Sequence, residues 1–365
     1  MNYIYTRRIA RRALNIGLYA GLLALGCASS AGAQSNTSVY GLLDLNLGAT
    51  SDFTSDHHTV ARVSSGGMNT SRLGFRGSED LGAGLRAVFQ LEVGLQPDTG
   101  GADAALFKRQ ANVGLEGAFG RVVVGRSFTT VYDFIIKYDP MGYAPFYSWA
   151  PSGSASGVSK YGMATAFDNM VKYAGKAGDF TFGASYGAGE QGGSAADDAK
   201  ASLGMDYAAG SWSTVATWDR VNGTTVAATG RRDAATAWHA GTMYSAGPLK
   251  IQLAARDYRL AAGKAATPAV RARLYWTGAS YVLTPADTLT GAVYYQDVRN
   301  VAAAADADPV MYVVRLRHAL SRRTDLYLAA AHARTRQGAP VSVSRDDPGF
   351  GDTQHGFVAG IQHRF

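Results

Sequence analysis

Residues 71–77 read SRLGFRG and residues 85–95 read LRAVFQLEVGL, with a short polar turn between them. In both segments leucine, phenylalanine and other apolar residues occupy alternate positions. A two-residue period is typical of a β-strand whose two faces meet different surroundings. One face here is almost pure hydrocarbon, and the other carries three arginines, Arg72, Arg76 and Arg86.

The same alternation recurs along the chain from Val39 onward, and no helical period exceeds two turns. We therefore expect only strands and loops. Sixteen strands are predicted, at residues 38–49, 69–77, 84–95, 108–116, 121–127, 168–174, 180–188, 199–208, 212–221, 234–245, 249–259, 271–283, 287–298, 309–320, 324–336 and 355–365.

The predicted connections alternate between short turns and long loops. The long ones lie near residues 50–68, 96–107, 128–167, 222–233 and 337–354. An even number of antiparallel strands of about ten residues, with short turns at one rim and long loops at the other, is typical of an outer-membrane β-barrel.

The energetic cost of misplaced charge orients the two faces of the strands. An arginine that faces lipid near the middle of a bilayer costs about 2 to 4 kcal/mol. The apolar face is therefore predicted to contact lipid and the arginine face to point inward. Because a barrel of about sixteen strands is too wide for side chains to fill, the arginines are predicted to line water.

The composition agrees with this fold class. The 365 residues include 44 Gly and 20 Tyr, and only 17% are charged. Such a glycine-rich, aromatic and charge-poor mixture differs from that of an ordinary helical enzyme. The mean hydropathy of -0.08 gives no indication of a helical membrane protein.

Residues 1–33 have the order of a secretory signal peptide: four arginines, an apolar run and the small-residue motif that ends at Ala33. We expect cleavage after Ala33, which leaves residues 34–365 as one barrel domain. The formal charge then becomes 31 − 28 = +3, because four of the 35 basic residues leave and all 28 acids stay. Nucleic-acid binding loses its support. The single cysteine, Cys27, also leaves, so no disulfide stabilises the mature chain.

Five segments resemble, in order, motifs of the general diffusion porins of Gram-negative bacteria, specifically the betaproteobacterial branch. They are SRLGFRGSEDLGAGL, FKRQANVGLEGAFGRVVVGR, FDNMVKY, LSRRT and the terminal GIQHRF. The resemblance implies an all-β, sixteen-stranded antiparallel transmembrane barrel that assembles as a homotrimer among outer-membrane lipids. It further implies that the third external loop, residues 128–167, folds inward, and that Phe365 is recognised by the barrel-assembly machinery.

The resemblance also assigns residues to the narrowing of the pore. Arg72 and Arg109 match the family's basic wall, and Glu92 matches an acidic residue facing it. Arg109 shares the outward parity of Ala111, but a bulge at this loop-to-strand junction is expected to turn it inward. The full predicted basic wall comprises Arg72, Arg76, Arg86, Arg109 and Arg126, and the predicted acidic side and third loop contribute Glu92, Asp133 and Asp139. The family often has one more arginine, where this chain has Ala166.

The function expected from these features is passive diffusion of ions and small hydrophilic solutes, with a mild preference for anions because basic residues outnumber acids at the narrowing. A channel specific for a sugar or an organic anion is the alternative, since aromatic residues of the third loop provide a possible binding track: Tyr143, Phe146, Tyr147 and Trp149.

An outer-membrane hydrolase is the second alternative, but no G-x-S-x-G motif is present. The GAGEQG segment at 187–192 lacks the helix that a dinucleotide site requires. Only His57 and His58 are adjacent, and the other histidines show no metal-binding spacing. We therefore expect no enzymatic activity, cofactor or metal centre.

Overall fold

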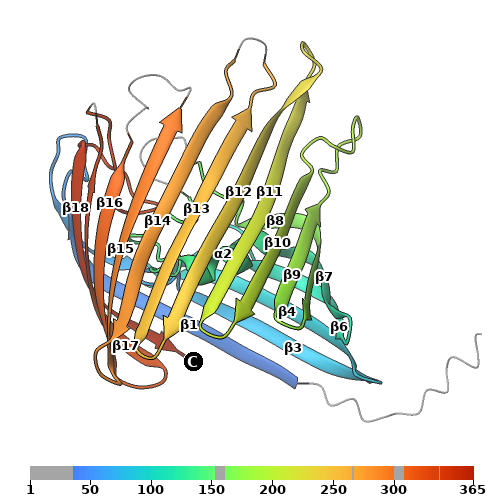
Figure 1. Cartoon of the computed structure of the whole chain (residues 1–365), viewed down its shortest axis with the longest axis horizontal. Coiled ribbons are helices and arrows are strands. Elements are labelled where there is room, and N and C mark those ends of the chain that lie inside the picture. The colour runs from blue at the N-terminus through green and yellow to red at the C-terminus, as the bar shows by residue number, and fades with distance from the viewer. Residues whose placement is uncertain (1–35, 153–160, 265–266, 300–307, 337) are drawn as a thin grey trace, which may run out of the picture.

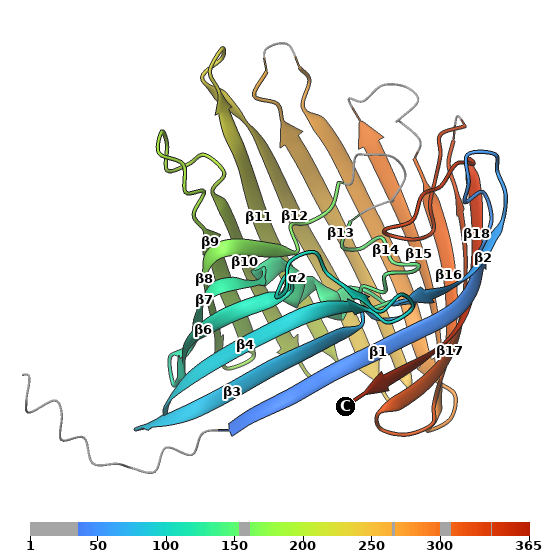
Figure 2. The same ribbon diagram turned by 180° about the vertical axis from the view of Figure 1, so that it is seen from behind.

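The computed structural model describes residues 36–152, 161–264, 267–299, 308–336 and 338–365, so the predicted signal peptide lies outside the described residues. Sixteen long strands form a closed antiparallel barrel (Figures 1 and 2), which confirms the predicted fold class. They are β1 (Asn36–Thr50), β3 (Arg72–Gly82), β4 (Leu85–Gln96), β6 (Gln110–Gly117), β7 (Gly120–Phe128), β8 (Ala166–Ala177), β9 (Phe180–Gly187), β10 (Lys200–Ala209), β11 (Trp212–Val226), β12 (Arg231–Ala246), β13 (Leu249–Ala261), β14 (Val270–Val282), β15 (Asp287–Arg299), β16 (Val310–Ala319), β17 (Thr324–Arg334) and β18 (Thr353–Arg364).

The barrel closes because the first strand pairs with the last. Leu42 of β1 lies opposite Arg364 of β18 on one side and opposite Arg72 of β3 on the other. Two short strands complete the sheet. β2 (Val60–Ser65) pairs with the C-terminal part of β1, and β5 (Gly101–Ala102) pairs with the end of β4.

Residues 66–71, between β2 and β3, bend into the barrel around Asp44. The Asp44 carboxylate is fully buried and accepts backbone N–H groups of Gly67, Met68 and Asn69 at 3.1, 3.1 and 2.7 Å. It also accepts the Tyr327 hydroxyl at 2.6 Å. The predicted strand at 69–77 therefore begins later than expected, at Arg72, because the preceding backbone bonds to a side chain instead of to a neighbouring strand.

Side chains alternate between the two faces as the sequence predicts. Along β1, Val39 and Leu47 are exposed on the outside of the barrel, whereas Asp44 and Asn46 are buried on the inside. Phe75 on β3 faces outward, and Glu92 on β4 faces the interior. Apolar outward residues continue around the sheet, so the outer surface suits lipid contact.

The prediction of a long loop at residues 222–233 is wrong. β11 continues to Val226 and β12 begins at Arg231, with a register shift between Asn222 and Thr225. Gly223 and its polar neighbours suggested a loop, but threonine and valine favour strands and extend this hairpin beyond its predicted ends. Figure 1 shows the hairpin of β11 and β12 rising at the upper rim.

The prediction of strands and loops alone is also wrong for the segment after β7. It contains α2 (Thr130–Ile135), whose first turn is capped by the Thr129 hydroxyl, and the 3-10 helix η1 (Ile136–Tyr138). Both are too short to produce a helical period in the sequence. Within the described part of the chain, no helix has the length and apolarity needed to cross a bilayer.

This helical segment lies inside the barrel, as both views show (Figures 1 and 2). The Trp276 indole donates to the Tyr138 carbonyl at 2.9 Å, and the Arg256 guanidinium donates to the Ala150 carbonyl at 2.6 Å. The Trp149 indole reaches the Ser342 carbonyl at 3.1 Å. These contacts join the segment to the inner faces of β13 and β14 and to the loop before β18.

The inner wall behind this segment is largely apolar on β14, β15 and β16. Leu274, Trp276, Tyr294 and Met311 point inward from β14, β15 and β16 and are almost fully buried. They pack in one cluster with side chains of α2, η1 and residues 141–150. The loop therefore provides a hydrophobic core inside the channel, and inward positions need not be polar where it covers them.

Candidate functional site

Glu92 is the centre of a polar cluster on the inner wall of β1, β3 and β4. Its carboxylate accepts Arg109 Nε at 2.7 Å and the Tyr40 hydroxyl at 2.7 Å, and Arg72 Nε lies 3.9 Å away. Gln90 donates to the Tyr40 oxygen at 2.6 Å. The structure thus brings together Arg72, Arg109 and Glu92, the three residues assigned by motif.

Arg109 faces inward even though Ala111 faces lipid. It precedes β6, whose first residue is Gln110, and its backbone N–H donates to the Glu92 carbonyl at 3.3 Å. The guanidinium carbon lies 5.1 Å from the centre of the Phe128 ring. Arg109 lies before the first paired residue of the strand, so its side chain does not follow the alternation of the strand. The inward direction agrees with the expectation, but the pairing of β4 with β6 shows no register shift, so the expected bulge is not observed.

At two places on the inner wall an acidic residue is buried, whereas its basic partners reach toward the bore. Asp325 of β17 is only 3% exposed, but Arg317 and Arg364, at 3.6 and 2.9 Å from it, are 39% and 41% exposed. Asp206 of β10 is 4% exposed, and Lys137, at 3.6 Å, is 50% exposed. At these two places the bore therefore meets guanidinium and ammonium groups more than carboxylates, whereas Asp133 is more exposed than its partner Lys172.

Four arginines form a stripe across the wall; Arg317 and Arg364 are exposed, whereas the side chains of Arg72 and Arg109 are only 28% and 14% exposed. Arg364 and Arg72 lie on either side of Leu42 at the same level, and Arg317 and Arg109 continue the stripe at its two ends. Sequence reasoning found Arg72 and Arg109 but missed the other two. The alternation in β16 could have revealed Arg317. Residues at even positions of this strand face lipid, so Arg317, which like Met311 stands at an odd position, faces inward.

Arg76 and Arg86 lie nearer the rim of short turns. The guanidinium carbon of Arg76 is 5.0 Å from the Tyr40 ring centre, and Arg86 forms an ion pair with Glu116. Together with Arg121 they line a recess of about 320 Å³. They are inward-facing as predicted, but they lie away from the Glu92 cluster.

Two other predicted residues are engaged elsewhere. Arg126 forms an ion pair with Asp168 on the neighbouring strand and donates to the Lys108 carbonyl, so it does not join Glu92. Asp133 is paired with Lys172, which also donates to the Phe128 carbonyl at 2.9 Å. Ala166 borders a recess of about 560 Å³ whose lining includes Arg109 and Arg126.

Asp139 was expected to present its charge to the bore, but it is 2% exposed. Its oxygens accept the Tyr294 hydroxyl, the Ser148 hydroxyl at 2.7 Å, and the backbone N–H groups of Tyr143 and Met141 at 2.7 and 3.2 Å. This correction has a physical reason: a buried carboxylate needs hydrogen bonds on both oxygens. Asp139 fastens the loop to β15.

The loop aromatics offer little binding surface. Tyr143, Tyr147 and Trp149 are buried in the packed cluster, and only Phe146 is partly exposed. Burial raises the pKa of the Tyr143 hydroxyl well above its ordinary value, so this group stays neutral. The aromatic track that a sugar-specific channel requires is therefore not formed by these four residues.

Phe365 ends the chain beside β1. Its backbone N–H donates to the Gly41 carbonyl at 3.1 Å and its carbonyl accepts the Gly41 N–H at 3.1 Å. The ring covers Gly41 so closely that a β-carbon there would lie 2.2 Å from the ring. Gly41 thus leaves room for the terminal aromatic side chain at the seam of the barrel, where β1 pairs with β18.

Comparison with known proteins gives one family. The family model described as "Gram-negative porin" matches residues 20–338. An "Outer membrane porin protein" of Bordetella pertussis is 32% identical over 247 residues, which cover 60% of this chain and 62% of that relative. The match thus spans somewhat less than two thirds of the relative's length.

Solved structures share the fold. The "Anion-selective porin from Comamonas acidovorans" superposes with a TM-score of 0.76 at 23% identity, covering 91% of this chain and all of that one. OmpT of Vibrio cholerae, in a structure titled "trimer form", gives a TM-score of 0.68 at 17% identity, covering 91% and 99%.

Proposed function

The chain belongs to the Gram-negative porin family, whose barrels lie in the outer membrane, and we propose that it forms a water-filled, anion-preferring channel for passive diffusion of ions and small hydrophilic solutes. The family and the fold indicate a channel and not an enzyme. The conclusion depends chiefly on one observation, the arrangement of buried acids beneath exposed cations on the inner wall.

This arrangement favours anions by simple electrostatics. The buried carboxylates of Asp325 and Asp206 are each covered by arginine or lysine, so their field in the bore is largely cancelled while the basic groups remain in contact with water. Rings and stripes of arginine and lysine are how anion-conducting pores select their ions. The likeness to a structure titled as an anion-selective porin supports the same proposal.

Reversal potentials across a planar bilayer with a KCl gradient test the proposal. The parent protein is expected to pass chloride in preference to potassium. The double variant Arg317→Gln, Arg364→Gln should lower this preference, because two exposed charges leave the bore and Asp325 loses its partners. Arg334→Gln is the matched control, since this exposed residue stands at an outward-facing position of β17. Potassium preference in the parent protein would contradict the proposal.

We also propose a homotrimer, which the trimeric structure of a fold neighbour supports. The outer face of the first strands is strongly apolar: Val39, Leu47, Val113 and Val124 are all more than half exposed in the single chain. The mass of the detergent-solubilised protein, measured by light scattering with detergent correction, tests this stoichiometry. A monodisperse monomer would refute the trimer and leave the channel proposal standing.

The sugar- or organic-anion-specific alternative makes a different prediction. A specific channel binds its solute, so ion current falls at low solute concentration and saturates. We expect no saturable block by sugars, because three of the four loop aromatics are buried and only Phe146 is partly exposed.

A further inference from the structure

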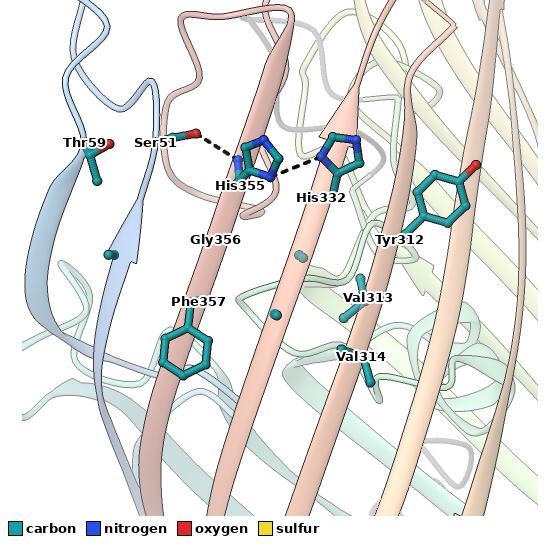
Figure 3. Close-up of a pocket in the computed structure, with 12 residues that line it drawn as sticks. Ser51, Thr59, Tyr312, Val313, Val314, His332, His355, Gly356 and Phe357 are labelled. Carbon is teal, nitrogen blue, oxygen red and sulfur yellow. Dashed lines mark hydrogen bonds between the residues drawn. The ribbon is translucent and has the colours of Figure 1, made fainter.

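Two histidines face each other on the outside of the barrel, away from the pore. His332 of β17 lies directly opposite His355 of β18 in the strand register. Their Nδ1 atoms are 3.3 Å apart and their ring centres 4.7 Å apart. Figure 3 shows both rings side by side in an open groove of about 630 Å³, with Tyr312 on one side and Ser51 on the other.

The neighbours of the pair hold the two rings in place. The Tyr312 ring is nearly parallel to that of His332, at an interplanar angle of 15° and a centre distance of 6.4 Å. The backbone N–H of His355 donates to the Ser51 hydroxyl at 2.9 Å. Alanines at 49 and 330 leave the groove open next to the imidazoles, so a small ion has access.

The distance between the two nitrogens suits a shared metal ion. A transition metal binds imidazole nitrogen at about 2.0 to 2.1 Å, so two such ligands in a tetrahedral shell lie roughly 3.3 to 3.4 Å apart. Without a metal, one Nδ1 must carry a proton and donate it to the other. A bound ion would replace that proton. The observed separation is that of a tetrahedral shell, and a square-planar Cu²⁺ shell, with neighbouring nitrogens about 2.9 Å apart, would draw the two atoms slightly together.

We propose that His332 and His355 form a two-histidine site for a divalent transition-metal ion on the outer face of the barrel. Among the described residues there is no cluster of three or more histidine, cysteine or carboxylate side chains that could hold a metal. Two protein ligands therefore hold the ion and water completes its shell. Imidazole ligands favour Cu²⁺ over Ni²⁺ and Zn²⁺, and they bind Mg²⁺ and Ca²⁺ poorly.

The site would also connect β17 to β18, the strand that closes the barrel against β1. The two histidines lie near the ends of these strands, two residues from Arg334 and from Thr353 respectively. A metal bridge there would restrain the end of the hairpin and the loop between the two strands. Conduction should be unaffected, because both rings point away from the bore.

The test uses purified, folded protein in detergent, without a polyhistidine tag. Isothermal titration with CuCl2 and ZnCl2 should give one site per chain, and the Cu²⁺ electron paramagnetic resonance spectrum should show nitrogen coupling from imidazole. His332→Gln and His355→Gln should each weaken Cu²⁺ binding at least tenfold. MgCl2 in excess should not displace Cu²⁺.

His363→Gln is the matched control, because His363 also faces outward on β18 but lies opposite Thr324 instead of a histidine. This variant should bind Cu²⁺ like the parent. Retention of heat-modifiable migration on gels shows that each variant is folded. The proposal is overturned if the parent binds no Cu²⁺ with imidazole coupling, or if the double variant His332→Gln, His355→Gln binds it as tightly as the parent.

Discussion

Replacing Asp139 with alanine is expected to loosen the inward loop while the barrel stays closed. The carboxylate is 2% exposed and accepts four hydrogen bonds, from Tyr294, Ser148, Tyr143 and Met141. Alanine removes both acceptor oxygens, and with them all four hydrogen bonds, and leaves buried donors without partners. The sheet itself is untouched, because Asp139 lies outside every strand.

The magnitude follows from the burial of this group. Each hydrogen bond to a charged group contributes about 1.5 to 3 kcal/mol, so the loss of two of these four bonds costs about 3 to 6 kcal/mol. Since each 1.4 kcal/mol is a factor of ten, the ratio of attached to detached loop should fall by roughly two to four powers of ten. The remaining anchors, among them Arg256 and Trp276, keep the loop inside for part of the time.

Single-channel recording in planar bilayers measures this effect. The Asp139→Ala protein should show more current noise and excursions to higher conductance, and larger neutral solutes should pass. Asp133→Asn is the control, because Asp133 is more exposed and has a single ion-pair partner, Lys172. If folded Asp139→Ala gives the same quiet current and solute limit as the parent and the control, the buried carboxylate does not anchor the loop.

Three further perturbations test other parts of the structure. Glu92→Gln should increase chloride preference in a salt gradient, because it removes the charge that neutralises Arg72 and Arg109; a shift toward potassium would contradict this. Deleting Phe365 should reduce the amount of inserted barrel in outer-membrane fractions without altering the conductance of the pores that form, and normal insertion would refute the terminal signal. Leu253→Arg places a charge on the outward face of β13 and should lower stability in urea by about 2 to 4 kcal/mol; an unchanged unfolding midpoint in lipid vesicles would place Leu253 outside the bilayer.

The sequence predicts the barrel well because its strongest signal, two-residue alternation, arises from local surroundings. Every residue on one face of a strand meets the same solvent, so the strand at 287–298 was predicted within one residue of its observed end at Arg299. The two helices of the inward loop gave no such signal, because each is shorter than two turns. The strand at Val60–Ser65 was hidden in a predicted loop, because it pairs with only the far end of β1.

The site was harder to predict, because its energetics depend on contacts between distant segments. Asp139 and Tyr294 are 155 residues apart in the chain, and nothing near either residue in the sequence indicates their hydrogen bond. Arg72, Arg109 and Glu92 were found because a motif and the alternation agreed. Arg317 and Arg364 could have been found by applying the same alternation to the last strands.

The pairing of β1 with β18 has a consequence for biogenesis. Leu42 obtains its partner Arg364 only when the end of the chain is present, so no shorter, unfinished chain can form the same seam. Until then the two edge strands of the sheet carry unpaired backbone N–H and C=O groups, which readily pair with strands of other molecules. A polypeptide clipped near its C-terminus is therefore expected to accumulate as aggregate or be degraded, and not to persist as a smaller pore.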